Sequence, residues 1–556
     1  MLTTKIVSSQ EKIFLDSSIY QYPTVERISA LRGERVSVQF VYTYDSRVTG
    51  PISYPSRYDI VAEGELLTYA TMREVASVPV TKAILIEDID DNYLRTTPGL
   101  YPDLLRPIYY GGKATIITGK TAAIWVEVSI PEDMKAGEYE ISFSIDAAEY
   151  GTSKASVKIE VIDAVLPKED IYFTQWFHAD CLANYYNVDV WSEKHWEVVE
   201  NFVHTARRNG INLLLTPVFT PPLDTAVGGE RRTTQLVGVT KCANDYTFDF
   251  SLVDRWIDMC DRQGIEYLEI SHLFTQWGAK HAPKIMATVD GEYKKIFGWD
   301  TEATGKEYTT FLRQFLTELL AHLKARGDDK RCFFHISDEP GLDHLENYKA
   351  AKAVVADILE GYTIIDALSK YDFYQTGVLA HPIPANNHIE PFLENNVPHL
   401  WTYYCVSQYQ DVSNRYMSMP LWRTRSIGMQ MYKYNIEGFL QWGYNFYNNQ
   451  CSGDPINPYV DTSADFAFPS GDAFSVYPGA DGTALESTRI LAHFEALQDI
   501  KAMKLCEKYY GHDAVVAAIE ETFGKTLTFA TCAKSGEMML RIREKINEMI
   551  KKAISK

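Results

Sequence analysis

Short runs of alternating hydrophobic and polar residues dominate the first 165 residues of the chain. Examples are Arg35–Tyr42, Ala123–Ile130 and Ala155–Ile162, and Gly, Pro and Asp residues lie between such runs. Alternation with period two predicts strands with one buried face. Many short strands with regular turns are typical of two packed antiparallel sheets. We therefore expect an N-terminal β-sandwich over residues 1–165.

The hydrophobic period changes after Pro167, where helical patterns begin to alternate with buried strand-like runs. The clearest helix is expected over residues 192–209, with Ser192 as its N-cap. Trp191 and Trp196 occupy the positions of a hydrophobic staple, and Gly210 suits the position after the last turn. The apolar run INLLLTP follows at once, and the same order of helix, basic residue, Gly and strand recurs twice further on.

Eight strand-like runs are expected in this second part of the chain. They are residues 171–178, 211–217, 266–273, 332–337, 372–378, 398–405, 437–446 and 473–477. Apolar strands that alternate with helices indicate a parallel sheet covered on both faces. Eight such units predict a (β/α)₈ TIM barrel over residues 166–500, and a doubly wound sheet is the alternative. Residues 501–556 are expected to form a helical extension packed on the barrel.

The net charge of −20, from 54 basic and 74 acidic residues, opposes binding to phosphate backbones and anionic lipid surfaces. We therefore expect no nucleic-acid partner. No stretch reaches 18 consecutive apolar residues, so no membrane span is expected. The first residues carry no apolar signal-peptide region, which favours a cytoplasmic location, with secretion as the alternative. The eight scattered cysteines form no CxxC pair and predict reduced, mostly buried thiols.

Functional residues of a TIM barrel lie at the carboxyl ends of its strands. The strand ends expected here carry acids, histidines and large aromatic residues. Asp338 and Glu339 are the catalytic candidates. The substrate-binding candidates are His178, His272, Trp401, Tyr403, Tyr404, Trp442, Asn445 and Tyr477. GxxxxGK[ST], HExxH and GxSxG motifs are absent, so the NTPase, zincin and serine-hydrolase classes are not indicated.

The motif HISDEPG is the most informative feature. Pro340 and Gly341 end the strand directly after Asp338 and Glu339. Two adjacent carboxylates repel each other, so one pKa should rise, as a general acid near neutral pH requires. The alternative is that Asp338 caps the next helix and Glu339 is only solvated. A metal site built from His178, His272 and Asp338 lacks close ligand spacing, so we expect no metal and no cofactor.

Together these residues resemble glycoside hydrolase family 123. The resemblance covers nearly the whole chain. It includes Asp-Glu-Pro after the fourth strand, Trp401 and Tyr403 in the sixth, the Arg423 region before KYNIEGFLQWGYN, and the segment SVYPGADG…LESTRI…FEALQDI. The family implies an exo-acting, retaining β-N-acetylgalactosaminidase that removes terminal β-GalNAc from glycans, including glycosphingolipid oligosaccharides.

The resemblance also implies a substrate-assisted mechanism. Asp338 would hold and polarise the 2-acetamido group, whose oxygen attacks the anomeric carbon to give an oxazoline. Glu339 would protonate the leaving oxygen and then activate water. A tyrosine is expected to hold the acetamido oxygen, and Tyr403 and Tyr404 are both candidates.

Two other classes of function stay open at this point. One is an ordinary retaining β-glycosidase or another β-hexosaminidase with an enzyme nucleophile, for which Glu437 and Asp472 are the available second carboxylates. The other is a glycan-binding barrel without catalysis. The sequence makes no prediction of the oligomeric state.

Overall fold

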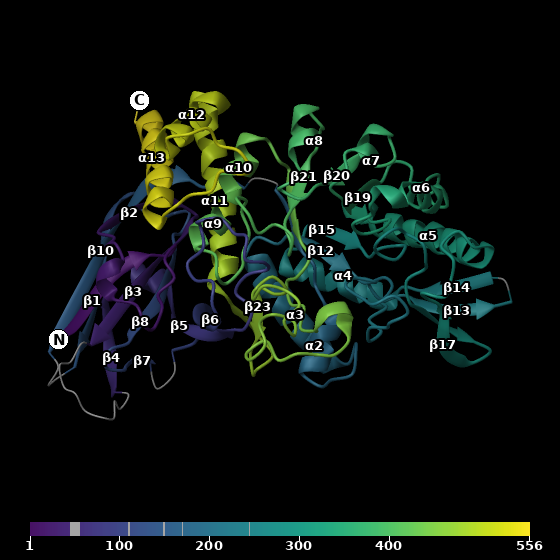
Figure 1. Ribbon diagram of the computed structural model, residues 1–556, viewed down its shortest axis with the longest axis horizontal. Coiled ribbons are helices and arrows are strands. Elements are labelled where there is room, and N and C mark those ends of the chain that lie inside the picture. The colour runs from purple at the N-terminus through teal and green to yellow at the C-terminus, as the bar shows by residue number, and fades with distance from the viewer. Residues whose placement is uncertain (45–55, 109–111, 148–150, 169–170, 244, 556) are drawn as a thin grey trace.

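The computed structural model describes residues 1–44, 56–108, 112–147, 151–168, 171–243 and 245–555. In Figure 1 the strand-rich N-terminal part lies on the left, and the part that combines strands with helices extends to the right. The last helices of the chain lie above the N-terminal strands.

Ten strands form two sheets in the first 165 residues, as the alternating pattern predicts. The first sheet has the order β1 (Leu2–Ser8), β3 (Arg35–Tyr44), β8 (Thr121–Ser129), β5 (Ala70–Val80) and β6 (Gly99–Arg106). The second has the order β2 (Arg27–Arg32), β10 (Thr152–Val165), β9 (Gly137–Asp146), β4 (Ser56–Glu63) and β7 (Lys113–Ile116). Inward-facing apolar residues of both sheets share one core, in which Phe40 stacks on Phe143 with ring centroids 5.3 Å apart.

Eight parallel strands follow in two hydrogen-bonded sheets. One has the order β11 (Tyr172–Gln175), β22 (Gly438–Gln441) and β21 (Trp401–Tyr403). The other has the order β12 (Leu213–Thr216), β15 (Tyr267–Ile270), β18 (Cys332–Phe334), β19 (Thr363–Ala367) and β20 (His381–Ile383). Between the sheets, the Asn212 N–H donates to the Phe173 carbonyl over 3.1 Å, and Ala385 forms a parallel bridge with Tyr403.

Six of the eight predicted strands coincide with these parallel strands, and two do not. Residues 372–378 were expected to be a strand, but Asp372–Gln375 form the short helix α7. The strand of that unit is β19, which lies earlier in the chain. Its β-branched run TIIDA was not predicted to be a strand. Residues 473–477 reach into β23 (Val476–Pro478), which pairs antiparallel with β24 (Ala484–Glu486) and lies outside the parallel sheets.

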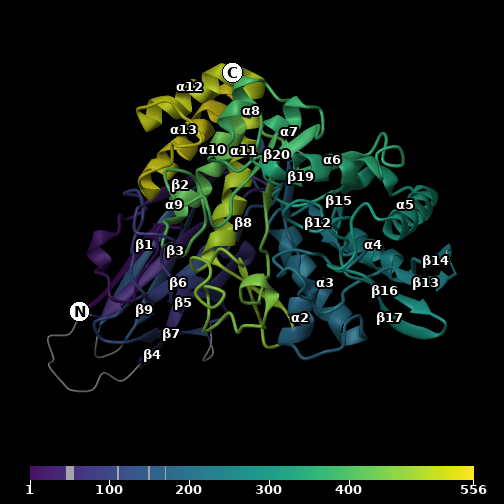
Figure 2. The same cartoon turned by 45° about the vertical axis from the view of Figure 1, so that its right-hand side comes forward.

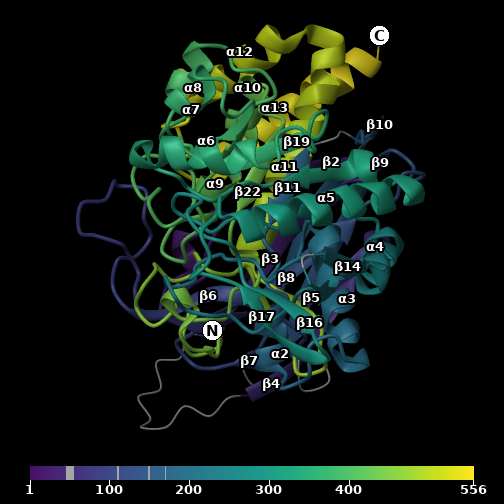
Figure 3. The same cartoon turned by 90° about the vertical axis from the view of Figure 1, so that its right-hand side faces the viewer.

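Three long helices lie outside the parallel strands and contact one another in sequence order (Figure 3). They are α3 (Glu193–Arg208), α4 (Ser251–Gln263) and α5 (Lys306–Arg326). Arg255 of α4 pairs with Glu193 of α3, and Arg326 of α5 pairs with Asp258 of α4. The predicted cap of α3 is confirmed, because the Ser192 side chain accepts a hydrogen bond from the His195 N–H. Trp191 and Trp196 pack with ring centroids 4.8 Å apart, as the staple predicts.

Shorter elements complete this part of the chain. The helices are α2 (Ala179–Tyr185), α6 (Leu345–Ala353), α8 (Glu390–Glu394), α9 (Leu421–Arg425) and α10 (Ile427–Lys433). A small sheet projects at the far right of Figure 1, with the order β14 (Asp245–Asp249), β13 (Gly238–Cys242), β16 (Ile285–Val289) and β17 (Glu292–Phe297). Its strands follow β12 and β15 in the chain, so it extends the loops that leave two of the parallel strands.

The C-terminal helices connect the two parts of the molecule (Figure 2). They are α11 (Thr488–Tyr510), α12 (His512–Phe523) and α13 (Gly536–Ile554). Helix α11 runs across the predicted boundary at residue 500 and contacts both α10 and α13. Helix α13 contacts α9 and α11, and it also contacts β2 and β10 of the N-terminal sheets. Among the described residues, no helix combines the length and apolar character needed to cross a bilayer.

Candidate active site

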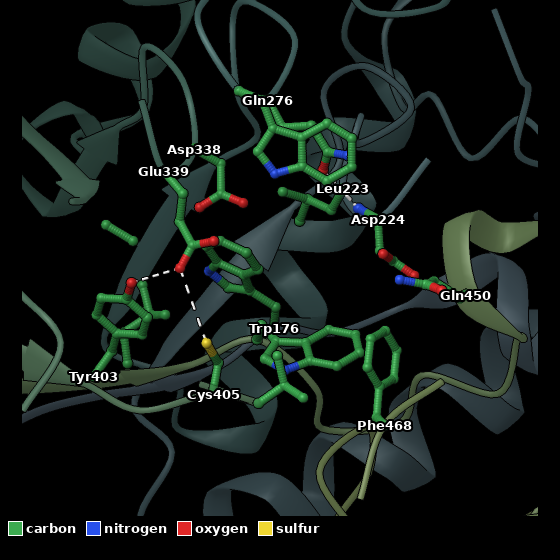
Figure 4. Close-up of a pocket in the computed structure, with 15 residues that line it drawn as sticks. Trp176, Leu223, Asp224, Gln276, Asp338, Glu339, Tyr403, Cys405, Gln450 and Phe468 are labelled. Atoms are coloured by element: carbon green, nitrogen blue, oxygen red, sulfur yellow. Dashed lines mark hydrogen bonds between the residues drawn. The ribbon is translucent and has the colours of Figure 1, made fainter. Parts of the chain in front are cut away.

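A pocket of about 210 Å³ opens at the carboxyl ends of the parallel strands. Most of these strands contribute to its wall: Trp176 follows β11, Asp224 follows β12, Trp277 follows β15 and Tyr403 ends β21. Asp338 and Glu339 follow β18 and lie side by side in the pocket (Figure 4). Because all of these strands run in one direction, their ends bring together residues that are more than 200 positions apart in the sequence.

Backbone hydrogen bonds hold the Asp338–Glu339 pair at the end of β18. The Trp277 N–H donates to the Asp338 carbonyl over 2.9 Å, and the Glu339 N–H donates to the Ala367 carbonyl over 3.0 Å. Glu339 adopts a φ of 43°, in the left-handed region that non-glycine residues rarely occupy. Asp224 and Trp277 share this feature, with φ values of 40° and 57°. Such strained residues persist where the surrounding structure over-determines them, and they concentrate at functional sites.

Tyr403 and Cys405 contact the Glu339 carboxylate from the end of β21. The Tyr403 hydroxyl donates to Glu339 Oε1 over 2.5 Å, and the Cys405 thiol lies 3.9 Å from the same oxygen. Both contacts are drawn in Figure 4. Burial raises the pKa of Tyr403 well above its usual value, so the phenol stays protonated and acts as a donor. The Glu339 carboxylate therefore has one fixed hydrogen-bond partner within the site.

Desolvation shifts both carboxyl groups of the pair toward the neutral form, and repulsion by Glu339 adds to the shift of Asp338. Desolvation, and then the charge of Glu339, raise the pKa of Asp338 well above its usual value. Desolvation also raises the pKa of Glu339, while the hydrogen bond from Tyr403 lowers it. Both side chains reach the pocket, but protein atoms enclose them on the remaining sides. Two coupled acids with raised pKa values hold a shared proton more readily than isolated carboxylates, which suits a pair that gives a proton to a substrate.

A third carboxylate, Asp224, faces the pair across the pocket (Figure 4). Its Oδ2 accepts a hydrogen bond from the Cys451 N–H over 3.0 Å, and its own N–H donates to Gln276 Oε1 over 2.7 Å. Burial raises the pKa of Asp224 to about 6. Asp472 lies behind Trp442, whose indole N–H donates to it over 3.1 Å, and burial raises its pKa to about 7. The site is therefore rich in acids that take up protons readily.

Four of the predicted site residues line this pocket: Asp338, Glu339, Tyr403 and Trp442. Trp442 packs edge-on against Phe468 with ring centroids 5.3 Å apart, and Trp176 adds a second indole to the wall. These rings give the pocket the amphipathic aromatic surface expected of a sugar site.

Four other predicted residues are not part of the pocket lining, and their side chains form hydrogen bonds with other protein groups. Asn445 exchanges two hydrogen bonds with the His178 backbone, while the His178 ring bonds to the Trp442 carbonyl and to Arg231. The Tyr404 hydroxyl bonds to His493 Nδ1 over 3.2 Å, and the Tyr477 hydroxyl donates to Asp103 over 2.6 Å. The structure therefore places these four side chains in buried hydrogen bonds outside the pocket lining, and their contact with a substrate stays a prediction.

Trp401 and His272 are also buried outside the pocket wall. Trp401 lies in a core cluster of the parallel strands, where it stacks on Tyr172 at 5.0 Å with an interplanar angle of 17°. Trp401 and Tyr403 are two positions apart on β21, so their side chains lie on the same face of the strand, but only Tyr403 reaches the pocket. His272 stacks on His335 with ring centroids 4.2 Å apart and is 1 % exposed. The structure therefore gives neither side chain the substrate contact that its strand position predicts.

Several residues that line the pocket were missed from the sequence. They are Trp176, Leu223, Asp224, Gln276, Trp277 and Cys405. Trp176 and Trp277 carried a usable signal, since each is an aromatic residue close after a buried strand. Asp224 lies in the loop FTPPLD, eight residues beyond β12, and no periodicity places such a residue at the pocket.

Among the described residues, His272, His335 and Asp366 form the group best able to hold a metal, with one candidate atom of each within 4.8 Å of the others. The two imidazole planes lie 19° apart in a stacked arrangement. Their in-plane nitrogen lone pairs run side by side and do not converge on one ion. Both nitrogens of His335 already bond to carboxylates. The geometry therefore does not fit a metal centre.

Comparison with known proteins agrees with the character of this pocket. Residues 176–506 match the catalytic domain of glycoside hydrolase family 123. A family 123 glycoside hydrolase from Clostridium perfringens, studied for glycolipid glycan hydrolysis, is similar over 100 % of both chains with a TM-score of 0.76 and 16 % identity. A Bacteroides ovatus GH5 xyloglucanase covers 85 % of this chain and 98 % of its own at a TM-score of 0.29 and 10 % identity, which supports no inference. No curated protein sequence matches the chain.

The acids, aromatic walls and strand-end position of the pocket are those of a carbohydrate-cleaving enzyme. The chain belongs to glycoside hydrolase family 123, because the matched catalytic domain spans more than half of it. The predicted family resemblance is thereby confirmed, and the chain is a glycosidase.

Proposed function

We propose that this glycosidase is an exo-acting β-N-acetylgalactosaminidase that removes terminal β-GalNAc with retention, through attack by the substrate's own acetamido group. One observation carries the proposal: Asp338 and Glu339 lie side by side in the pocket, with Tyr403 hydrogen-bonded to Glu339. Adjacent carboxylates suit a reaction in which the second acid steadies a substrate nucleophile and does not itself attack from the opposite face of the sugar.

We interpret the eight parallel strands as a (β/α)₈ barrel and the preceding sheets as a β-sandwich. The pairings and the two inter-sheet contacts support the cyclic order β11, β12, β15, β18, β19, β20, β21, β22. The pocket at the carboxyl ends of the strands is where barrel enzymes place their active sites.

In this mechanism Asp338 accepts the acetamido N–H and stabilises the positive charge that develops as the ring closes. The acetamido oxygen forms a bond to the anomeric carbon, and the bond to the leaving oxygen breaks. An ionised Asp338 is required at this step, while Glu339 carries the proton of the coupled pair. Electrostatic stabilisation of this kind is among the largest contributions to catalysis.

Glu339 gives its proton to the leaving oxygen and then removes one from the water that opens the oxazoline. Its raised pKa supports the first role, since a general acid must hold its proton near working pH. The contacts of Tyr403 and Tyr404 also indicate which tyrosine holds the acetamido oxygen. Its hydroxyl is at the pocket, while that of Tyr404 is bonded to His493 in the interior. We therefore assign Tyr403 to the acetamido oxygen.

The size and lining of the pocket support a single terminal sugar as the bound group. Its volume of about 210 Å³ is below the roughly 300–1,000 Å³ usual for sites that take drug-sized ligands. Glycolipid glycans are proposed as the source of that sugar because the similar Clostridium perfringens enzyme was studied for their hydrolysis. No step of the mechanism needs a metal or cofactor.

A screen with aryl β-GalNAc, β-GlcNAc and β-Gal substrates tests this function. We expect turnover of β-GalNAc above β-GlcNAc and negligible turnover of β-Gal, which has no acetamido nucleophile. Equal turnover of β-Gal would favour an enzyme nucleophile, and no turnover of any of the three would favour a glycan-binding protein.

A second candidate is an ordinary retaining glycosidase, and the position of Asp224 favours it. Its carboxylate faces the Asp338–Glu339 pair across the pocket, where an enzyme nucleophile would be needed (Figure 4). Glu437, considered for that role from the sequence, is instead exposed and bonded to His399 before β22 begins. Incubation with a 2-fluoro sugar, followed by peptide mapping, would label Asp224 only in this second mechanism.

A further inference from the structure

A buried histidine lies three residues before Asp338, at the end of β18. The His335 ring is fully buried and lies between two carboxylates. Its Nδ1 is 3.0 Å from Asp366 Oδ1, at β19, and its Nε2 is 2.7 Å from Glu269 Oε1, on β15. The three side chains thus link adjacent strands directly beneath the catalytic pair.

Hydrogen-bond accounting indicates that both His335 nitrogens carry protons. Each of the two contacts needs one proton. The carboxylates also accept from groups that can only donate: Asp366 from the Ile336 N–H over 3.1 Å, and Glu269 from the Trp176 indole N–H over 2.7 Å. Each carboxylate oxygen therefore acts as an acceptor in these contacts, and both hydrogen bonds of His335 are complete when both imidazole nitrogens donate. Consistently, these partners raise the pKa of His335 to about 9 against the effect of burial.

His272 covers one face of this imidazolium. The two rings stack at 4.2 Å, and neither nitrogen of His272 has a hydrogen-bond partner among the described residues. Burial and the adjacent His335 charge lower the pKa of His272 well below its usual value, so it is neutral. A neutral aromatic face against a cation is a favourable contact in a desolvated site.

The same three residues are tied to the walls of the pocket. Asp366 accepts the backbone N–H groups of Ile336 and Ser337, immediately before Asp338. Its neighbour Ala367 accepts the Glu339 N–H, and Glu269 holds Trp176, which lines the pocket. The network therefore positions the backbone of the catalytic acids, and it places the charge of His335 near Asp338.

We propose that His335 is a positioning residue: a protonated imidazolium that binds Glu269 to Asp366, orients the end of β18 and places near Asp338 a positive charge that favours the ionised form catalysis uses. This inference rests on the proposed substrate-assisted function. Without the cation, the charges acting on Asp338 would be those of Glu339, Asp366 and Asp224, and all of these disfavour a further negative charge. The titratable groups facing His335 are Glu269, Asp366, His272 and Asp338.

Two substitutions should shift the acid limb of the pH profile of kcat in opposite directions. His335→Gln removes a positive charge, so the pKa of Asp338 rises and the acid limb moves to higher pH. We expect kcat at neutral pH to fall about 10-fold or more, in the range of partners that orient active-site groups, with a smaller change in KM. Glu269→Gln removes a negative charge and should move the acid limb to lower pH. An unchanged acid limb in both variants would overturn the proposal.

His195→Gln is the matched control. His195 is another buried histidine with both ring nitrogens bonded, but to the Trp191 N–H and the Ala179 carbonyl, with no carboxylate partner. It should leave the acid limb in place, whereas an equal shift would show that loss of any buried histidine suffices.

A measurement on the unaltered protein separates this inference from the proposed function. With ¹⁵N-labelled histidine, we expect one ring to keep both nitrogens protonated at about pH 8, where an ordinary histidine is neutral. A complete set of neutral rings at that pH would overturn the proposal even if the enzyme cleaves β-GalNAc. Absence of hydrolysis with the doubly protonated ring present would instead count against the proposed function alone.

Discussion

The Tyr403 hydroxyl donates a hydrogen bond to Glu339 Oε1 over 2.5 Å, across the pocket from the end of one strand to the end of another. A donor to the carboxylate favours its ionised form, so this contact lowers the pKa of the residue proposed as general acid. In the proposed complex the same hydroxyl turns to the acetamido oxygen. Glu339 then loses its donor and holds its proton more firmly, at the moment when the proton is needed.

Tyr403→Phe tests this exchange. Loss of the donor should raise the pKa of Glu339 in the free enzyme, so the alkaline limb of kcat/KM moves to higher pH. The rate should fall about 10²-fold, because the acetamido oxygen also loses its hydrogen bond. Tyr404→Phe is the control, since that hydroxyl bonds to His493 in the interior. Similar pH profiles for both variants would contradict the assignment.

Glu339→Gln should nearly abolish hydrolysis of glycosides with poor leaving groups and spare more activity on activated aryl glycosides. A good leaving group needs little protonation, whereas general acid catalysis contributes roughly 10²–10⁴-fold for a poor one. Brønsted plots over a series of aryl β-GalNAc substrates measure the difference. Glu437→Gln, at an exposed carboxylate bonded to His399, should leave both rates unchanged. Equal losses on all substrates would remove Glu339 from the acid role.

Asp338→Asn should lower kcat by about 10²-fold or more while substrate binding changes little, because Asp338 acts on charge that develops only as the oxazoline forms. A galacto-configured thiazoline, which mimics the cyclised intermediate, should inhibit far more tightly than GalNAc. Asp224→Asn is the comparison. If it abolished the chemical step and Asp338→Asn did not, the enzyme-nucleophile mechanism would be preferred.

His272→Phe should retain activity within a few-fold. The phenyl ring can keep the stacked contact with His335, and His272 makes no hydrogen bond that would be lost among the described residues. Activity should also survive EDTA, since the stacked imidazoles do not converge on an ion. Loss of β-GalNAc hydrolysis in the variant, or restoration of EDTA-treated enzyme by a divalent metal, would return His272 to the functional site.

Arg543→Leu should destabilise the protein by about 3–5 kcal/mol, measured by urea unfolding. The side chain pairs with Glu34 at 2.7 Å and with Asp499 at 3.2 Å, and all three are less than one-tenth exposed. Its removal leaves the buried Glu34 without its ion-pair partner, while Asp499 keeps its pair with Arg425. Lys551→Ala breaks the ion pair between Glu160 and Lys551, and the lysine is half exposed. This change should lower the free energy of unfolding by less than about 1 kcal/mol. Equal losses of stability in the two variants would show that burial does not determine the cost of breaking an ion pair in this protein.

The sequence was sufficient for the parts of the site that follow from strand periodicity. Asp338 and Glu339 stand directly after a buried strand, and the alternation of β21 brings Tyr403 to the pocket while Tyr404 faces the helices. The choice between these tyrosines needed the direction of the strand relative to the pocket, which a three-residue strand does not reveal.

The remaining site residues depend on long-range contacts that the sequence does not show. His178 and Asn445 occupy strand ends as expected, but the Asn445 side chain bonds to the His178 backbone, and the His178 ring bonds to the Trp442 carbonyl and to Arg231. Asp224 reaches the pocket from an irregular loop held by Gln276 and Cys451. Strand β19 was missed although Gly361, which lies two residues before it with a φ of 82°, is the same kind of break that precedes other strands of this part of the chain.

The contact of α13 with β2 has a consequence for the order in which the protein can mature. Glu544 accepts hydrogen bonds from both the backbone and the hydroxyl of Ser29, and Asn547 donates to the same residue. The strand that contains Ser29 precedes Glu544 by 515 residues, so it leaves the ribosome long before its helical partner. The sheet that contains β2 therefore waits with one exposed edge until α13 is synthesised, and a nascent chain cut short before α13 carries an unfinished surface that chaperones and proteases can recognise.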